Sequence, residues 1–212
     1  MLGYLRQHIT DYLKANIVAY FFLILIFIIG VVAGSLAVKA LPDEQKTELL
    51  SYLHVFFQGL STGTENIQDA KLLNSILFNN AKTIGLIWLL GFTVIGIPFI
   101  LFIIFTRGFI IGFTVGFLVN EYIMKGLVFS LASVLPHNFL AIPALLAAGV
   151  SAISFSLLLV RQRVRKTSLF YQTISYTLFC GGSLLFMLLA GFIEVVISPV
   201  FMKLLAGLLM KE

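Results

Sequence analysis

The chain has 212 residues, of which 60% are hydrophobic and 11% are charged, and its mean hydropathy is +1.07. Soluble domains contain about 45–50% apolar and about 25% charged residues, so this composition excludes a soluble globular protein. It indicates an all-α polytopic membrane protein, because a helix satisfies its own backbone groups in lipid. The single cysteine, Cys180, cannot form an internal disulfide and gives no information on the redox compartment.

Apolar stretches with few or no charges predict about five membrane spans, since about 20 apolar residues cross a bilayer as a helix. These spans are predicted to form a single membrane domain over residues 1–212. The first stretch is too long for the apolar part of a cleaved signal peptide, so we interpret it as a retained anchor. Arg107 marks a predicted chain reversal between the second and third spans. The predicted spans are approximately residues 17–38, 83–106, 108–124, 126–160 and 167–198, with an outer loop at residues 39–82.

The fourth predicted span is unusually long. A continuous helix over residues 126–160 would extend roughly 52 Å, whereas the hydrocarbon core is only ~30 Å thick. Pro136 and Pro143 lie within this span, and each removes a backbone hydrogen bond from a helix. We therefore expect the helix to break at the prolines. A six-span alternative would divide this stretch into two.

Basic residues indicate the orientation. Their density favours a cytoplasmic N-terminus and an extracytoplasmic C-terminus under the positive-inside rule. A basic cluster, Arg161, Arg163, Arg165 and Lys166, directly follows the fourth predicted span. It is expected to determine the topology, and it could also bind anionic lipid, whose headgroups attract each basic side chain by roughly 1 kcal/mol.

The outer loop is predicted to contain amphipathic helices. After Pro42, acidic residues are followed by Leu49, Leu53 and Phe56 at three- and four-residue spacing, which is typical of a helix with one apolar face. Such a helix either lies flat on the membrane surface or presents a docking face to an extracytoplasmic partner. The candidate interface residues are Tyr52, Leu53, Phe56 and Phe57.

Glycines recur at four-residue spacing in two of the predicted spans. In lipid, faces of small residues allow helix backbones to approach closely and so promote packing. This pattern predicts helix contacts within one bundle, with a homodimer seam as the alternative. The glycines are Gly30, Gly34, Gly108, Gly112 and Gly116.

Three polar residues of the apolar stretches are candidates for a functional or structural cluster. We predict that His137, Asn138 and Glu194 meet in the outer half of the membrane and determine how the last two spans pack, because polar groups in lipid require partners. A polar-lined kink at the prolines is the simpler interpretation of His137 and Asn138. Two donors are fewer than the three or four protein ligands that zinc requires, so no metal or other cofactor is expected.

Four stretches of the sequence resemble the stage II sporulation protein M family. They read "NNAKTIGLIWLLGFTVIGIPFIL", "RGFIIGFTVGFLVNEYIMKG", "FSLASVLPHNFLAIPALLAAG" and "GFIEVVISP". Pro136, His137 and Pro143 match the family's fourth-span pattern, while Asn138 and Ala141 depart from it. The resemblance implies a five-span protein of the sporulation septum that anchors the engulfment machinery. Its implied partners are the peptidoglycan-degrading sporulation proteins D and P, with no role for nucleic acid.

No recognisable catalytic motif in the sequence points to an enzyme. The sequence shows no nucleophile paired with a base, no HExxH motif and no phosphate-binding loop. A non-enzymatic scaffold is therefore the favoured function. A small transporter or channel is the alternative, in which a broken fourth helix would place His137 and Glu194 in a substrate or proton pathway.

Overall fold

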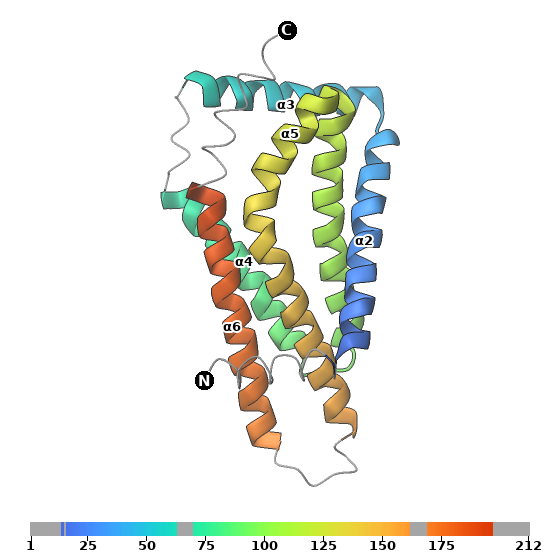
Figure 1. Ribbon diagram of the computed structural model, residues 1–212, viewed down its shortest axis with the longest axis vertical. Helices are drawn as coiled ribbons and strands as arrows, with labels where there is room; N and C mark the ends of the chain where they lie inside the picture. Colours follow the sequence, from blue (N-terminus) through green and yellow to red (C-terminus); the bar gives the residue numbers. More distant parts are fainter. Residues whose placement is uncertain (1–13, 15, 63–69, 162–168, 197–212) are drawn as a thin grey trace.

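The computed structural model describes residue 14 and residues 16–62, 70–161 and 169–196, and all elements in these ranges are helices. Helices α2, α4, α5 and α6 run lengthwise along the bundle, while α3 lies across one end (Figure 1). We call this end the α3 end. The all-helical fold class is thus confirmed. The helices are α2 (Ile17–Lys39), α3 (Asp43–Thr62), α4 (Ala70–Leu90), α5 (Gly96–Arg161) and α6 (Leu169–Val196).

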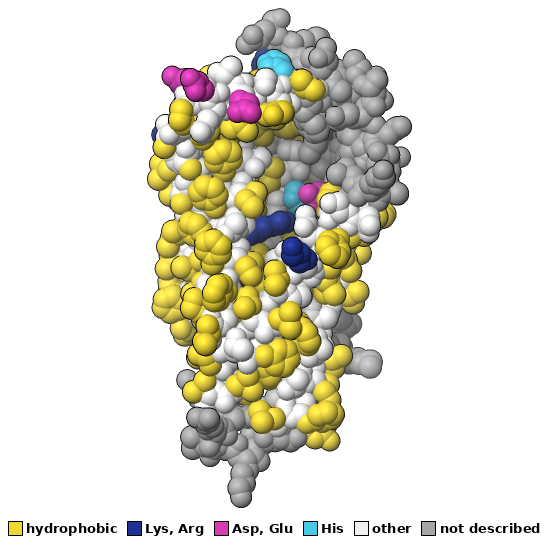
Figure 2. All heavy atoms as spheres, turned by 180° about the vertical axis from the view of Figure 1, so that it is seen from behind, with side chains coloured by type: hydrophobic (Ala, Val, Ile, Leu, Met, Phe, Trp, Pro, Cys, Tyr) yellow, Lys and Arg dark blue, Asp and Glu magenta, His cyan; other side chains and the backbone are white. Residues whose placement is uncertain are grey.

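Three of these helices, α2, α5 and α6, are long and apolar enough to cross a membrane. Their outward surfaces carry large apolar side chains such as Phe21, Phe102 and Leu178, which are 62%, 65% and 71% exposed. Apolar side chains are the most frequent kind of coloured side chain on the described part of the face in Figure 2. A surface of this kind is suited to contact with acyl chains, so the predicted transmembrane character is confirmed.

The chain reverses at residues 91–95, between α4 and α5, and not at Arg107. The N–H groups of Phe92 and Thr93 donate to the carbonyls of Leu89 and Leu90, which closes the end of α4. At Gly96 a Cβ atom would collide with the carbonyl oxygen of Leu90, so this turn requires a glycine. The predicted boundaries of the second and third spans are therefore wrong, and the helix passes uninterrupted through Arg107.

Helix α5 doubles back on itself at Ile123, near the α3 end (Figure 1). Ile123 has φ 48° and ψ −120°, and it divides α5 into a first limb, residues 96–122, and a second limb, residues 124–161. The second limb stays helical through Pro136 and Pro143, so the predicted break at the prolines is not found. Prolines are tolerated inside membrane helices because neighbouring helices and side chains satisfy the freed backbone groups.

Helix α2 packs along the first limb of α5 through glycines of both helices. A Cβ atom on Gly30 or Gly34 would collide with a backbone carbonyl oxygen of the first limb, and one on Gly108 or Gly112 would collide with a carbonyl oxygen of α2. A Cβ atom on Gly116 would lie 3.0 Å from the Cα of Ser35. The structure thus places these five glycines at one seam inside a single chain.

An aromatic cluster joins α4, α5 and α6 near the end opposite α3. The Tyr176 hydroxyl donates to the carbonyl of Trp88 at 2.8 Å, and its ring stacks on Phe155 with centroids 4.4 Å apart. Ser156 Oγ donates to the carbonyl of Thr93 at 2.9 Å. These contacts fix the turn at residues 91–95 against the second limb and α6.

Candidate functional site: an intramembrane polar cluster

A group of polar side chains comes from both limbs of α5 and from α6. Arg107 lies on the first limb, His137 and Asn138 on the second limb, and Glu194 near the α3-side end of α6. Asn138 is buried, and the other three are half-buried. We call these four residues the polar cluster. Figure 2 shows a histidine, an acidic side chain and basic side chains close together at mid-height, separate from the charged side chains at the top of the view.

Arg107 links the other ionisable groups of the polar cluster. Its positive charge attracts the carboxylate of Glu194, and it also acts electrostatically on His137. Water screens such interactions weakly in a buried, low-dielectric setting. The described residues include no salt bridge between Arg107 and Glu194 within 4.0 Å, so this attraction between the first limb and α6 acts without direct contact.

The side-chain amide of Asn138 determines which ring nitrogen of a neutral His137 carries the proton. Asn138 Nδ2 donates to the carbonyl of Val134 at 2.8 Å and lies 2.9 Å from His137 Nε2. An amide nitrogen can only donate, so His137 Nε2 is the acceptor, and a neutral His137 ring carries its proton on Nδ1. Asn138 Oδ1 is buried and accepts no hydrogen bond. This carbonyl oxygen is therefore an unused acceptor.

Asn80 extends the polar contacts to α4. It is 4% exposed, and its Nδ2 donates to the carbonyl of Met187 on α6 at 3.3 Å. Gly191, one turn before Glu194, lies directly against Asn80, because a Cβ atom on Gly191 would be 2.8 Å from Asn80 Nδ2. Polar contacts thus tie α6 both to α4 and to α5.

The sequence alone did not indicate that Arg107 and Asn80 belong to this polar region. Arg107 is the only charged residue between Thr83 and Asn120, and we interpreted it as a turn. A single charge among 37 uncharged residues fits equally well a buried intramembrane charge with a partner. That pattern was the available signal. Nothing in the local sequence distinguishes Asn80 from its neighbour Asn79, which is exposed.

The described residues contain no group of three or more His, Cys, Asp and Glu side chains that could hold a metal ion. Within the polar cluster, His137 and Glu194 are the only side chains of these types. The chemistry that the site offers is charge pairing and hydrogen bonding.

The predicted interface residues of the outer loop lie on different sides of α3. Tyr52 is 66% exposed, whereas Leu53 is half-buried together with Leu49 and Leu50. The side chains of Phe56 and Phe57 lie outside the described residues, as do those of the basic cluster Arg161, Arg163, Arg165 and Lys166. The leucines face one way along α3, and Tyr52 faces the other way with Val55, which is 68% exposed.

The profile of stage II sporulation protein M matches residues 23–199. The chain belongs to the stage II sporulation protein M family. The match covers most of the chain and includes all residues of the polar cluster, so the resemblance expected from the sequence is confirmed. Neither a curated protein nor a solved structure matches the chain. Family membership makes this a sporulation-related membrane protein of a generally non-catalytic family.

Proposed function

We propose that this family member is a non-enzymatic scaffold of the sporulation septum, which anchors and recruits the peptidoglycan-degrading proteins D and P for engulfment. The observation that carries the proposal is the placement of α3. This helix lies across one end of the apolar bundle (Figure 1) and exposes Tyr52 and Val55. Exposed aromatic side chains of this kind often supply much of the binding energy of an interface.

The proposed topology places α3 on the side where the hydrolases act. In this topology α2, α4, the two limbs of α5 and α6 each cross the membrane, with the N-terminus in the cytoplasm and the C-terminus outside. The second limb ends at Arg161 and α6 begins at Leu169, both at the end of the bundle opposite α3 (Figure 1). The basic cluster follows Arg161 in the sequence, so the positive-inside rule assigns that end to the cytoplasm. The α3 end is then extracytoplasmic.

The glycine seam bears on the oligomeric state that we propose. The five glycines pack α2 on α5 within one chain, so they are not available as a contact between copies. We therefore expect a homodimer to form through a different face.

Site-specific photocrosslinking tests the scaffold proposal. A benzoylphenylalanine at position 52 should form adducts with sporulation protein D or P in sporulating cells. The same probe at Ile110, which is 52% exposed on the first limb, is the matched control and should not. If the protein is inserted and abundant but position 52 forms no protein adduct, α3 does not recruit the hydrolases.

A transporter or channel is the second candidate, favoured by the charges of Arg107 and Glu194 within lengthwise helices. Ionisable residues at such positions often mark ion or substrate pathways. Purified protein in liposomes should show no flux of ions or small solutes if the protein is a scaffold. Flux that His137→Ala abolishes would establish the second candidate instead.

A further inference from the structure

Helix α4 carries a polar stripe on its outward face. Ser75, Asn79 and Lys82 are exposed and follow one another at four- and three-residue spacing, so they lie on one side of the helix. Leu86 and Leu89, which are 43% and 58% exposed, continue the same side. The outward face of α4 therefore changes from polar to apolar about halfway along the helix.

Contacts with α6 give the depth of Lys82 in the bundle. The side chain of Asn80 donates to the carbonyl of Met187. The indole Nε1 of Trp88 donates to Thr177 Oγ1. The two helices are therefore antiparallel. Because Lys82 lies between Asn80 and Trp88 in the sequence, it lies level with the part of α6 between these two contacts.

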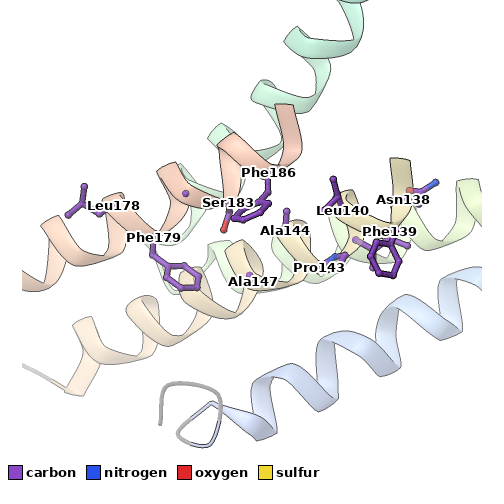
Figure 3. A pocket seen from close by; sticks show the side chains of 12 residues that line it. Asn138, Phe139, Leu140, Pro143, Ala144, Ala147, Leu178, Phe179, Ser183 and Phe186 are labelled. Carbon is purple, nitrogen blue, oxygen red and sulfur yellow. The ribbon is translucent and has the colours of Figure 1, made fainter. Parts of the chain in front are cut away.

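The surface of α6 at this depth is apolar. Leu185 is 64% exposed, and exposed apolar side chains continue along α6 in both directions, to Leu178 and to Val196. Figure 3 shows Leu178 and Phe186 on the side of α6 that lines an open groove against the second limb of α5. Val196 lies nine residues beyond Met187, and therefore ~13 Å nearer the α3 end. A lysine at the depth of Lys82 is too far inside the apolar zone to reach lipid phosphates.

The polar stripe has no cover among the described residues. No described acid lies within 4.0 Å of Lys82, and the side chain of Asn79 forms no hydrogen bond with a described residue. Ionisable side chains at membrane depth rarely face lipid and normally pair with other polar groups. Amide side chains in membranes form hydrogen bonds across helices. The stripe therefore requires a partner with complementary groups.

The chemistry of the stripe defines this partner. An ammonium group carries a positive charge and only donates hydrogen bonds, so a carboxylate complements Lys82. The amide of Asn79 both donates and accepts, so a hydroxyl or another amide complements it. Helix α4 contains no acid, and two copies joined through this face would place their lysines against each other. The face extends from Ser75 to Leu89, 14 residues and ~21 Å, a length along which another helix can pack.

We propose that the outward face of α4 binds a transmembrane helix of another protein. This helix carries an Asp or Glu side chain opposite Lys82 and, one turn away, a hydroxyl or amide side chain opposite Asn79. Water weakens such an ion pair little inside the hydrocarbon, where the dielectric constant is low. Leu86 and Leu89 pack against apolar side chains of the same helix. The site is separate from α3 and does not depend on the proposed recruitment of the hydrolases by α3.

Photocrosslinking to a model helix tests the proposal. Benzoylphenylalanine replaces Phe78, which is 68% exposed beside the stripe, and the full chain is reconstituted in phosphatidylcholine vesicles. The vesicles contain a Leu-Ala peptide of about 22 residues with a central Glu and a Ser one turn away, or the same peptide with Leu in place of Glu. The Glu peptide should give at least about fivefold more adduct, the ratio expected of one hydrogen bond between membrane helices. The probe at Phe186, in the apolar groove of Figure 3, should show no such preference.

Variants of Lys82 test whether its charge causes the preference. Lys82→Leu should abolish the preference, and Lys82→Arg should retain it. Lys82→Glu should reverse it, so that a peptide with a central Lys gives at least about fivefold more adduct than the Glu peptide. The matched control is Lys39→Leu, which removes an exposed lysine at the end of α2 and should leave the preference unchanged.

Three results would overturn the proposal. The first is equal capture of the Glu and Leu peptides by the probe at position 78. The second is a preference for the Glu peptide that persists in Lys82→Leu. The third is an adduct at position 78 with a second copy of the chain, or with another part of the same chain, because the protein itself would then cover the stripe.

Discussion

The attraction between Arg107 and Glu194 should contribute measurably to the stability of the bundle. The two side chains lie on the first limb of α5 and on α6, and each is half-buried. Among the described residues the pair forms no salt bridge within 4.0 Å, so the attraction acts over a longer distance and is weaker than that of a buried ion pair in contact. We therefore expect Glu194→Gln to cost about 1–2 kcal/mol, below the typical cost of breaking a buried ion pair.

Reversible unfolding in mixed detergent and sodium dodecyl sulfate micelles provides the assay. Fluorescence of Trp88, the only tryptophan, reports the transition, because its ring lies at the junction of α4 and α6, where Nε1 donates to Thr177 Oγ1 at 3.2 Å. Glu44→Gln on α3 is the control, since it makes the same chemical change at an exposed site and should shift the free energy of unfolding by less than about 0.5 kcal/mol.

A double-mutant cycle measures the interaction between Arg107 and Glu194 apart from the interactions of each side chain with other residues. Arg107→Gln combined with Glu194→Gln should cost clearly less than the sum of the single changes, because the double variant contains no uncompensated charge. The reasoning is refuted if Glu194→Gln costs less than about 0.5 kcal/mol, as in the control, and the two changes are additive.

Three further predictions concern packing, backbone strain and topology. Gly112→Ala should destabilise the protein by about 1–3 kcal/mol in the same unfolding assay, because its methyl group would collide with the Val31 carbonyl. The control is Gly182→Ala, where a Cβ atom would meet no atom within 4 Å. This change should be neutral or stabilising by up to about 1 kcal/mol. Ile123→Gly should stabilise by about 1 kcal/mol, since Ile123 has φ 48° and is 72% exposed, so strain is relieved with little loss of packing; a destabilised variant would contradict this. Replacing the basic cluster by Gln should disturb orientation, as read by a C-terminal topology reporter, and an unchanged reporter would show that other signals determine the topology. The residues replaced in this last variant are Arg161, Arg163, Arg165 and Lys166.

The sequence predicted those parts of the fold that depend on local composition. Uniform hydrophobicity identified α2 and α6, and the acidic start at Asp43 with leucines at helical spacing identified α3. The four-residue glycine spacing in α2 and α5 pointed to close backbone contact, and the structure places these glycines at one seam. Such features are visible in a short window because they arise from the helix period itself.

The predictions from sequence were wrong where polar residues within a helix find their partners on other helices. The first half of α4 contains polar residues such as Asn74 and Asn80, and the run without charged residues begins only after Lys82, so the predicted span started too late. In the folded chain, Asn80 donates to the Met187 carbonyl 107 residues away. Arg107 was interpreted as a turn for the same reason, because its partner Glu194 is 87 positions further along. Pairings at such separations leave no local pattern.

Localisation of sporulation proteins D and P in sporulating cells, with and without this protein, tests the central claim most directly. We expect fluorescent fusions of both hydrolases to concentrate at the septum in cells that contain the protein and to disperse in cells that lack it. Restoring the wild-type chain should restore the septal signal, and a triple variant, Tyr52→Ser with Phe56→Ser and Phe57→Ser, should not restore it despite normal membrane insertion. Septal concentration of both hydrolases in cells without the protein would contradict its proposed function as the anchoring scaffold.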